Sequence, residues 1–314
     1  MNVDRGSLGI PLPDPPVRGW RRGAPNVVLI VLDDVGFAQL GCFGSDIETP
    51  NMDRLAEAGL RFTNYHTTAL CSPTRASILT GRNHHRVGIG WHPDLPMRHA
   101  GYNGRIPRAA GTLAEVLQAE GWATYAVGKW HLTPRDERSP VGPFHHWPTQ
   151  KGFDRYYGFL GGDTNQWTPV LTRDQAFTDP PARPEDGYHL NEDLADQAIA
   201  YLRELRAYHV DRPFFLYYAT GATHAPHQVP SEWIERYRGR FDQGWDAWRG
   251  QVLNRQREMG VVPAGTELSP RPAWVSAWDD LDEREQAFCA RTMEVFAGFL
   301  SHTDHHLGRV IDEI

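Results

Sequence analysis

Runs of apolar residues along the chain predict the strands of a sheet. Residues 27 to 32 form a continuous β-branched and aliphatic run, too short for a buried helix and typical of a parallel strand covered on both faces. Residues 123 to 127 and 213 to 219 indicate two more buried strands, and residues 60 to 67 predict another. We therefore expect a sheet whose strands are spread over the length of the chain.

Capping residues and helical spacing predict helices between these strands. The predicted helices begin at or just after Thr49, Cys71, Thr112, Asn191 and Leu281. Gly59, Gly81 and Gly121 are placed to end the first three. Apolar residues at helical spacing support the last two helices: Leu194, Ala198, Leu202 and Leu205, then Phe288, Phe296, Phe299, Leu300, Leu307 and Val310. The short second helix starts just after Cys71, so this cysteine is expected near a helix N-terminus.

The alternation of strands and helices predicts an α/β fold with a largely parallel sheet flanked by helices. We divide the chain into a Pro-rich N-terminal arm, residues 1–24, and a domain, residues 25–314. Residues 133 to 187, rich in Pro, Gly, Trp and charge, are expected to be long surface loops. Ligands of such sheets bind at the carboxyl ends of the strands.

Three predicted strand ends carry polar side chains. Asp33 and Asp34 follow the first strand, the segment with Lys129 and His131 follows another, and His224 lies just past the strand ending at Ala219. The carboxyl ends of parallel strands meet at one edge of a sheet. We therefore expect these groups to converge on one active site.

Composition narrows the classes of function. The 314 residues are 40% hydrophobic, enough for a sizeable core, and the formal net charge of -7 argues against nucleic acid as a partner. The longest aliphatic run is far too short to cross a bilayer, and the N-terminus has no apolar signal region. We expect a cytoplasmic protein without a membrane partner.

Cysteine and lysine are both scarce. Cys42, Cys71 and Cys289 include no C-x-x-C pair, so neither a disulfide framework nor a zinc ribbon is indicated, and any special cysteine must act alone. Lys129 and Lys151 are the only lysines among many arginines. Retention of a lysine at 129 fits a role that arginine fills poorly, since a compact ammonium approaches an oxygen without imposing a planar fork.

Cys71 opens the most specific motif in the chain. Cys71-Ser72-Pro73-Thr74-Arg75, followed by Leu79-Thr80-Gly81-Arg82, resembles the C-x-P-x-R…T-G signature of the type I, formylglycine-dependent sulfatases, which include the arylsulfatases and belong to the alkaline phosphatase superfamily. The alternative is a buried structural cysteine beside a proline-started helix. The resemblance spans residues 26 to 314, and implies an alkaline-phosphatase-like α/β fold.

The resemblance also implies a mechanism. A separate maturation enzyme converts the cysteine to formylglycine, one hydroxyl of the hydrated aldehyde attacks sulfur and expels the alcohol, and loss of the proton from the other hydroxyl eliminates sulfate. Such covalent catalysis divides one difficult displacement into two easier steps. The helix N-terminus after Cys71 favours an anion there, and Arg75, one helical turn along, can face the same site. The expected substrate is a small sulfate ester.

Further residues acquire roles from the resemblance. Asp33 and Asp34 resemble paired ligands that hold a divalent cation, usually Ca²⁺ or another such as Mg²⁺, against the oxidised Cys71; a turn or helix cap is the alternative. Gly128-Lys129-Trp130-His131 resembles the element in which the lysine contacts sulfate and the histidine supports the nucleophile; both side chains could instead be solvated. His224 is expected to contact sulfate and to protonate the leaving group, in preference to His227.

Other polar groups are expected to be structural or solvated. His302, Asp304, His305 and His306 imitate a zinc site at helical spacing, but a solvated helix face is the preferred interpretation. The histidine pairs at 84–85 and 145–146 lie in predicted loops.

The resemblance is incomplete. Family members carry a later Asp-Asn pair for the metal and another lysine, and neither is found here. The chain is therefore expected to be the N-terminal part of a sulfatase, with a metal shell short of oxygen ligands. Two rival functions stay open: a phosphate or phosphonate ester hydrolase of the same superfamily, and a non-catalytic sulfatase-like module that binds an anion.

Overall fold

A six-stranded sheet forms the centre of the protein, and the computed structural model describes it within residues 19–20 and 22–314. The strands are arranged in the order β1-β6-β2-β3-β4-β5. Their bounds are β1 (Val27–Val31), β2 (Ala123–Lys129), β3 (Arg155–Phe159), β4 (Leu171–Arg173), β5 (Ala176–Thr178) and β6 (Phe214–Ala219). The first four strands in that spatial order are parallel, and β3, β4 and β5 pair antiparallel. This is the expected α/β class.

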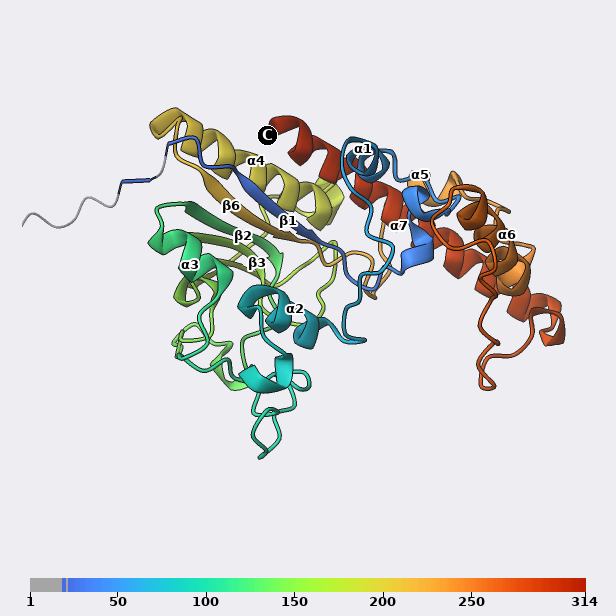
Figure 1. Ribbon diagram of the computed structural model, residues 1–314, viewed down its shortest axis with the longest axis horizontal. Helices are drawn as coiled ribbons and strands as arrows, with labels where there is room; N and C mark the ends of the chain where they lie inside the picture. Colours follow the sequence, from blue (N-terminus) through green and yellow to red (C-terminus); the bar gives the residue numbers. More distant parts are fainter. Residues whose placement is uncertain (1–18, 21) are drawn as a thin grey trace, which may run out of the picture.

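Helices cover both faces of the sheet (Figure 1). In the described residues they are α1 (Pro50–Ala58), α2 (Cys71–Thr80), α3 (Leu113–Ala119), α4 (Leu190–Tyr208), α5 (Ser231–Glu235), α6 (Gly244–Glu258) and α7 (Glu283–Glu313). Short 3-10 segments lie at Phe37–Gln39, Gly41–Phe43, His84–Val87, Arg135–Glu137, Pro148–Gln150, Pro184–Asp186 and Trp278–Asp280. No helix in this described part is long and apolar enough to cross a membrane.

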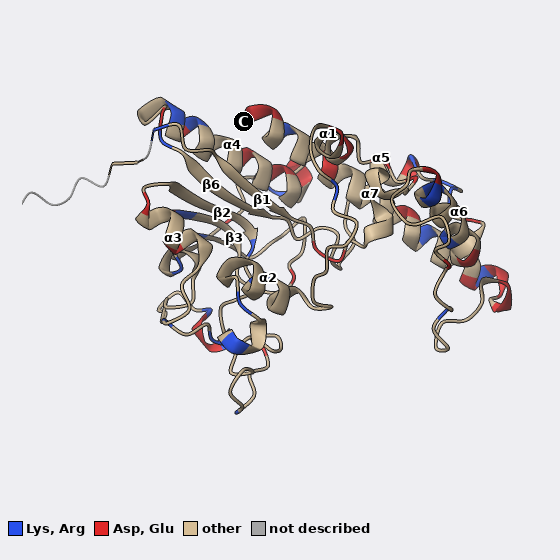
Figure 2. Cartoon of the chain, viewed as in Figure 1, with Lys and Arg blue, Asp and Glu red and all other residues tan. Residues whose placement is uncertain are grey.

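Alternating side chains of the strands build two cores. On one face, β2, β3 and β6 contribute Val127, Tyr157 and Leu216 to a cluster with α4 and the end of α7. On the other face, Ala126 and Tyr217 pack with α2, α3 and the segment after β2. The strands are therefore buried on both sides, as the continuous apolar runs predict. Figure 2 shows charged residues mainly on helices and loops, and few in the central strands.

A smaller apolar cluster lies beyond the sheet. The middle of α7 packs Phe296 and Leu300 against Tyr237, Phe241 and Trp278. In Figure 1 this part, with α5 and α6, extends away from the sheet. The long helix α7 thus joins the sheet core to this second cluster.

The predicted helix ends are mostly confirmed. Gly81 ends α2 in the left-handed conformation with φ 63°, and Thr112 with Glu115 forms a complete capping box on α3. Two starts differ from the prediction: α2 includes Cys71 as its first residue, and α4 is capped by His189, whose ring accepts a hydrogen bond from the backbone of Asn191.

Two predictions about strands are wrong. Residues 60–67 form an irregular, exposed segment, because no neighbouring strand in the described chain supplies partners for their backbone groups. Residues 133–187 contain β3, β4 and β5 as well as loops. Because that stretch is rich in glycine, its sequence did not predict β3. Within β3, Gly158 allows close contact with Gly128 of the adjacent strand.

Helix α7 is more deeply buried than predicted. His302, Asp304 and His306 are only 3%, 1% and 6% exposed, while His305 is exposed and Phe288, expected in the core, is 72% exposed. The carboxylate of Asp304 accepts backbone hydrogen bonds from Asn51 and Met52 at the start of α1, at 3.0 and 2.9 Å. The solvated face proposed for these residues is therefore wrong at three of its four positions. The expected arm, residues 1–24, lies mostly outside the described residues.

Candidate active site

A buried group of charges lies where β1 and β2 end. Asp33 lies two residues past the end of β1, and Lys129 is the last residue of β2. The Lys129 ammonium forms an ion pair with the Asp33 carboxylate. Arg75 of α2 approaches the same carboxylate at 3.6 Å and donates a hydrogen bond to the carbonyl oxygen of Lys129 at 2.8 Å. All three are at least 97% buried. Two cations around one carboxylate leave a local excess of positive charge.

Cys71 lies beside this group at the first position of α2. Its Sγ is 3.1 Å from Nδ1 of His131, which follows β2, and the other ring nitrogen of His131, Nε2, is 2.8 Å from the Asp94 carboxylate. Arg138 donates to the second oxygen of Asp94. With Nε2–H donated to Asp94, the Nδ1 lone pair of His131 faces the side chain at position 71.

The electrostatics keep this histidine neutral at pH 7. Burial lowers the pKa of His131 to about 4, against the opposing effect of Asp94, and Lys129 adds to the decrease. Burial opposes ionisation of Asp94, but hydrogen bonds from His131 and Arg138 outweigh it and lower the pKa of this carboxyl. The result is an ionised carboxylate orienting a neutral imidazole.

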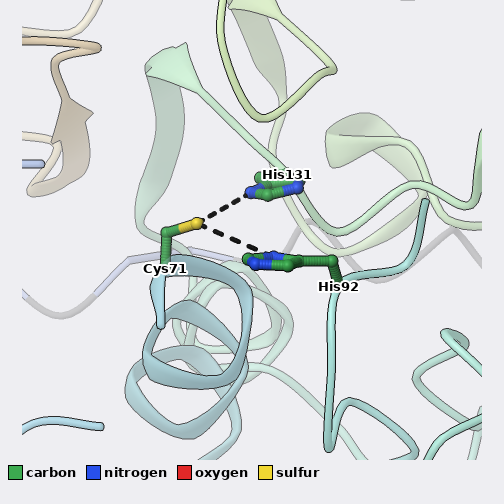
Figure 3. A group of neighbouring side chains, drawn as sticks. All are labelled: Cys71, His92 and His131. Carbon is green, nitrogen blue, oxygen red and sulfur yellow. Dashed lines mark hydrogen bonds between the residues drawn. The ribbon is translucent and has the colours of Figure 1, made fainter. Parts of the chain in front are cut away.

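His92 completes the surroundings of Cys71 and was missed in the sequence. Its Nδ1 lies 3.9 Å from Sγ of Cys71 and 3.4 Å from Oγ of Ser72, and its ring stacks on that of His131 with centroids 5.0 Å apart and planes at 13° (Figure 3). Burial lowers the pKa of His92 as well. His92 belongs to an irregular segment and to no strand end, so no local signal marks it.

Asp34, the residue after Asp33, lies beside His224. Asp34 has φ 56°, a conformation rare for side chains other than Asn, Asp and Gly, and its side chain is 64% exposed. Two backbone hydrogen bonds join Asp33 to the loop after β6, with Ala222 and Thr223, and this contact carries His224 to within 3.7 Å of Asp34. Asp34 is therefore directed outward, with His224 beside it.

The structure brings the predicted residues together in three contacting groups. Cys71 contacts His131, Asp33 contacts Arg75 and Lys129, and Asp34 contacts His224. An open pocket of about 530 Å³ is lined by Asp33, Asp34, Cys71 and Arg75 among others. His227 is not part of this arrangement; its ring packs near Phe296, with centroids 5.8 Å apart.

The carboxylates of Asp33 and Asp34 are the type of ligand that a hard divalent cation prefers, but two side chains supply few ligands. Carboxylate oxygens are the donors that Ca²⁺ and Mg²⁺ prefer, yet calcium takes six to eight of them. The Asp33 carboxylate is shared by Lys129 and Arg75. The two side chains therefore form part of a metal shell.

Comparisons with known proteins identify the family. A family model described as Sulfatase matches residues 25–314, so the chain belongs to the sulfatase family. Members of this family generally use formylglycine and a divalent metal. The structure is thus that of a sulfatase domain.

Among the relatives, an uncharacterised sulfatase of Schizosaccharomyces pombe is 34% identical over 92% of this chain and 54% of its own length. An arylsulfatase of Klebsiella aerogenes is 29% identical, and the match covers 92% of this chain and 62% of the relative. Human arylsulfatase A is 35% identical, and the match covers 76% of this chain and 50% of the relative. The chain spans roughly half to three fifths of the length of these relatives.

A solved structure, that of Ps i-CgsB in complex with k-i-k-neocarrahexaose, is similar with a TM-score of 0.64 and 25% identity, covering 93% of this chain and 55% of the other. The structure of BT4656 with its substrate D-glucosamine-2-N,6-O-disulfate is similar with a TM-score of 0.58 and 19% identity, and the match covers 93% of this chain and 62% of the other. At this identity the similarity shows only that the fold is shared.

Proposed function

We propose that this chain is the catalytic part of a sulfatase that hydrolyses small sulfate esters through formylglycine formed from Cys71 by a maturation enzyme. The observation that carries the proposal is the position of Cys71, which faces the His131–Asp94 pair and adjoins the Asp33, Arg75 and Lys129 group. A nucleophile beside an oriented base and an excess of positive charge suits attack on an anionic ester.

The cationic group provides the attraction for sulfate. Arg75 and Lys129 together outweigh the charge of Asp33, and the N-terminus of α2 adds backbone N–H groups at position 71. Charges held in a buried, fixed arrangement need no reorganisation when negative charge moves during the reaction. These residues would bind and orient the ester.

Two histidines are assigned to proton transfer. Neutral His131, oriented by Asp94, would accept a proton at Nδ1 from the nucleophile, whose hydrated aldehyde supplies the attacking hydroxyl. His224 Nδ1 donates to the carbonyl oxygen of Ala225 at 2.6 Å, so Nε2 is the atom that would hold the proton given to the leaving alcohol. His131 would thus serve the nucleophile and His224 the leaving group.

Asp33 and Asp34 would hold a divalent cation, Ca²⁺ or Mg²⁺, which stabilises negative charge on sulfate oxygens when bound. Asp34, with its exposed side chain at the pocket, is free to turn toward such an ion.

Mass spectrometry and kinetics together test the proposal. The protein is produced with a formylglycine-generating enzyme, and the peptide that contains Cys71 should lose about 18 Da relative to the thiol. The converted protein should hydrolyse an aryl sulfate with a kcat/KM well above that for the matching phosphate and phosphonate. Cys71→Ala should abolish turnover, whereas Cys289→Ala, in the cluster beyond the sheet, should retain it.

A large preference for phosphorus esters would replace the proposal with its superfamily rival. Conversion of Cys71 without hydrolysis of any ester, despite retained affinity for sulfate, would support an anion-binding module instead.

A further inference from the structure

Three soft or borderline donor atoms converge around position 71. Sγ of Cys71 and one ring nitrogen each of His92 and His131 all lie within 4.8 Å of one another (Figure 3). The two sulfur-to-nitrogen distances are 3.1 Å for His131 and 3.9 Å for His92. In a tetrahedral zinc site, bond lengths of about 2.3 Å to sulfur and 2.0–2.1 Å to nitrogen place these atoms about 3.5 Å apart. The observed distances lie on either side of that value.

The outer contacts of His131 are those of a metal ligand. A ligating histidine usually donates its second ring N–H to a carboxylate, which fixes both the tautomer and the ring orientation. Asp94 provides this contact at 2.8 Å, and Arg138, itself bonded to the carbonyl oxygen of Thr133 at 2.8 Å, holds Asp94 in turn. The imidazole is therefore already presented with its lone pair toward Cys71.

We propose that the unconverted protein, with Cys71 as a thiol, binds Zn²⁺ through Cys71, His92 and His131. One sulfur and two imidazole nitrogens favour zinc over hard cations, whereas the neighbouring carboxylates of Asp33 and Asp34 favour calcium or magnesium. Three protein ligands would leave the fourth position of a tetrahedral zinc ion for a water molecule. Because only three protein ligands are present, the site is an open one rather than a closed structural one.

Zinc binding depends on the chemical state of position 71. The thiol loses its proton when the metal binds, so the affinity rises with pH. Formylglycine has no sulfur, so conversion removes one of the three ligands and releases the metal. A consequence that rests on the proposed function is that zinc-bound Cys71 is protected from the maturation enzyme.

Metal titration of the thiol form tests the site. The protein is produced without a maturation enzyme, its Cys71 thiol is verified by mass, and Zn²⁺ is titrated against a chromophoric chelator. One equivalent should bind, and an excess of Ca²⁺ should not displace it. Substituted Co²⁺ should show thiolate charge-transfer absorption and the visible bands of a tetrahedral ion.

Variants locate the metal. Cys71→Ser and His92→Ala should each weaken Zn²⁺ binding by more than about tenfold, since loss of even an outer-shell contact commonly costs 10–100-fold. His145→Ala, which removes an exposed histidine elsewhere, is the matched control and should bind as the unmodified sequence does. Circular dichroism of each variant establishes that it is folded.

Zinc affinity that is equal in Cys71→Ser and the control, or a Co²⁺ complex without thiolate absorption, would overturn the site. These measurements use the thiol form, while ester hydrolysis uses the converted form. The zinc site can therefore fail while the sulfatase assay succeeds, and the reverse is equally distinguishable.

Discussion

Two groups of histidines in this protein have similar chemistry and different surroundings. His92 and His131 stack beside Cys71 at the pocket, whereas His189, His302 and His306 gather between α4 and α7. Burial lowers the pKa of His131 and His189 to about 4, that of His306 to about 3 and that of His302 to about 2. Neutral, buried imidazoles are therefore common to both groups.

The groups differ in what their ring nitrogens face. In the interior group, Nε2 of His306 and Nε2 of His302 are 3.0 Å apart, and Arg309 donates to Nδ1 of His306 at 3.1 Å. The other ring nitrogen of His302, Nδ1, lies 3.3 Å from the side-chain amide nitrogen of Asn191. Beside Cys71, Nδ1 of His92 and Nδ1 of His131 face the thiol. A cluster of histidines thus indicates chemistry only when a ring nitrogen is left for a ligand or nucleophile.

Removal of the buried cation should have the largest effect on the pocket. Lys129→Ala leaves the Asp33 carboxylate, 3% exposed, with Arg75 at 3.6 Å as its remaining cation. Breaking such a pair should lower the free energy of unfolding by about 3–5 kcal/mol. Urea denaturation measures this, with exposed Arg82→Ala expected within about 0.5 kcal/mol of the starting protein. A free energy of unfolding for Lys129→Ala equal to that of Arg82→Ala would contradict the argument.

The next largest effect should come from Asp94. Asp94→Asn removes the acceptor that fixes the His131 tautomer, so the sulfatase rate should fall by about 10²-fold or more while substrate affinity changes little. Steady-state kinetics on an aryl sulfate measures kcat and KM separately, and the loss should appear in kcat with little change in KM. Asp136→Asn, at an exposed ion pair with Arg105, is the control. A pH–rate profile unchanged by Asp94→Asn would show that the carboxylate does not orient His131.

The interior histidines should appear in the acid stability of the protein. Because the folded pKa of His302 is about 2 and its ordinary value is 6.5, only the unfolded chain binds this proton between those values. The stabilisation is complete above pH 6.5 and is lost as pH falls, by roughly 2 kcal/mol at pH 5 for one such histidine. Unfolding free energies at pH 5 and 7.5 should differ less in His302→Gln than in the starting protein.

His305 supplies the comparison for that measurement, since it occupies the same helix but is exposed. His305→Gln should leave the pH dependence as it is. If His302→Gln and His305→Gln gave the same change, burial would not be the cause.

The sequence alone determined the family and the α/β class, and it predicted the central residues of the candidate site. The residues of the Cys71 motif are adjacent in the sequence, so the motif can be recognised without knowledge of the fold. Asp33, Lys129 and His224 were predictable because each follows a buried apolar run, and parallel strands bring their carboxyl ends to one edge. The helix cap formed by Thr112 and Glu115 was also predictable, because its two residues interact within one helical turn.

Only the tertiary structure decided the partners of these residues. His92 and Asp94 come from an irregular segment whose path depends on packing, so neither periodicity nor a motif placed them beside His131. The same holds for α7, where the polar side chains of His302, Asp304 and His306 suggest a solvated face but are buried beneath α1, α4 and α5. Local patterns fix which segments are strands and helices, whereas burial and side-chain contact are set by segments far away in the sequence, which the local pattern does not contain.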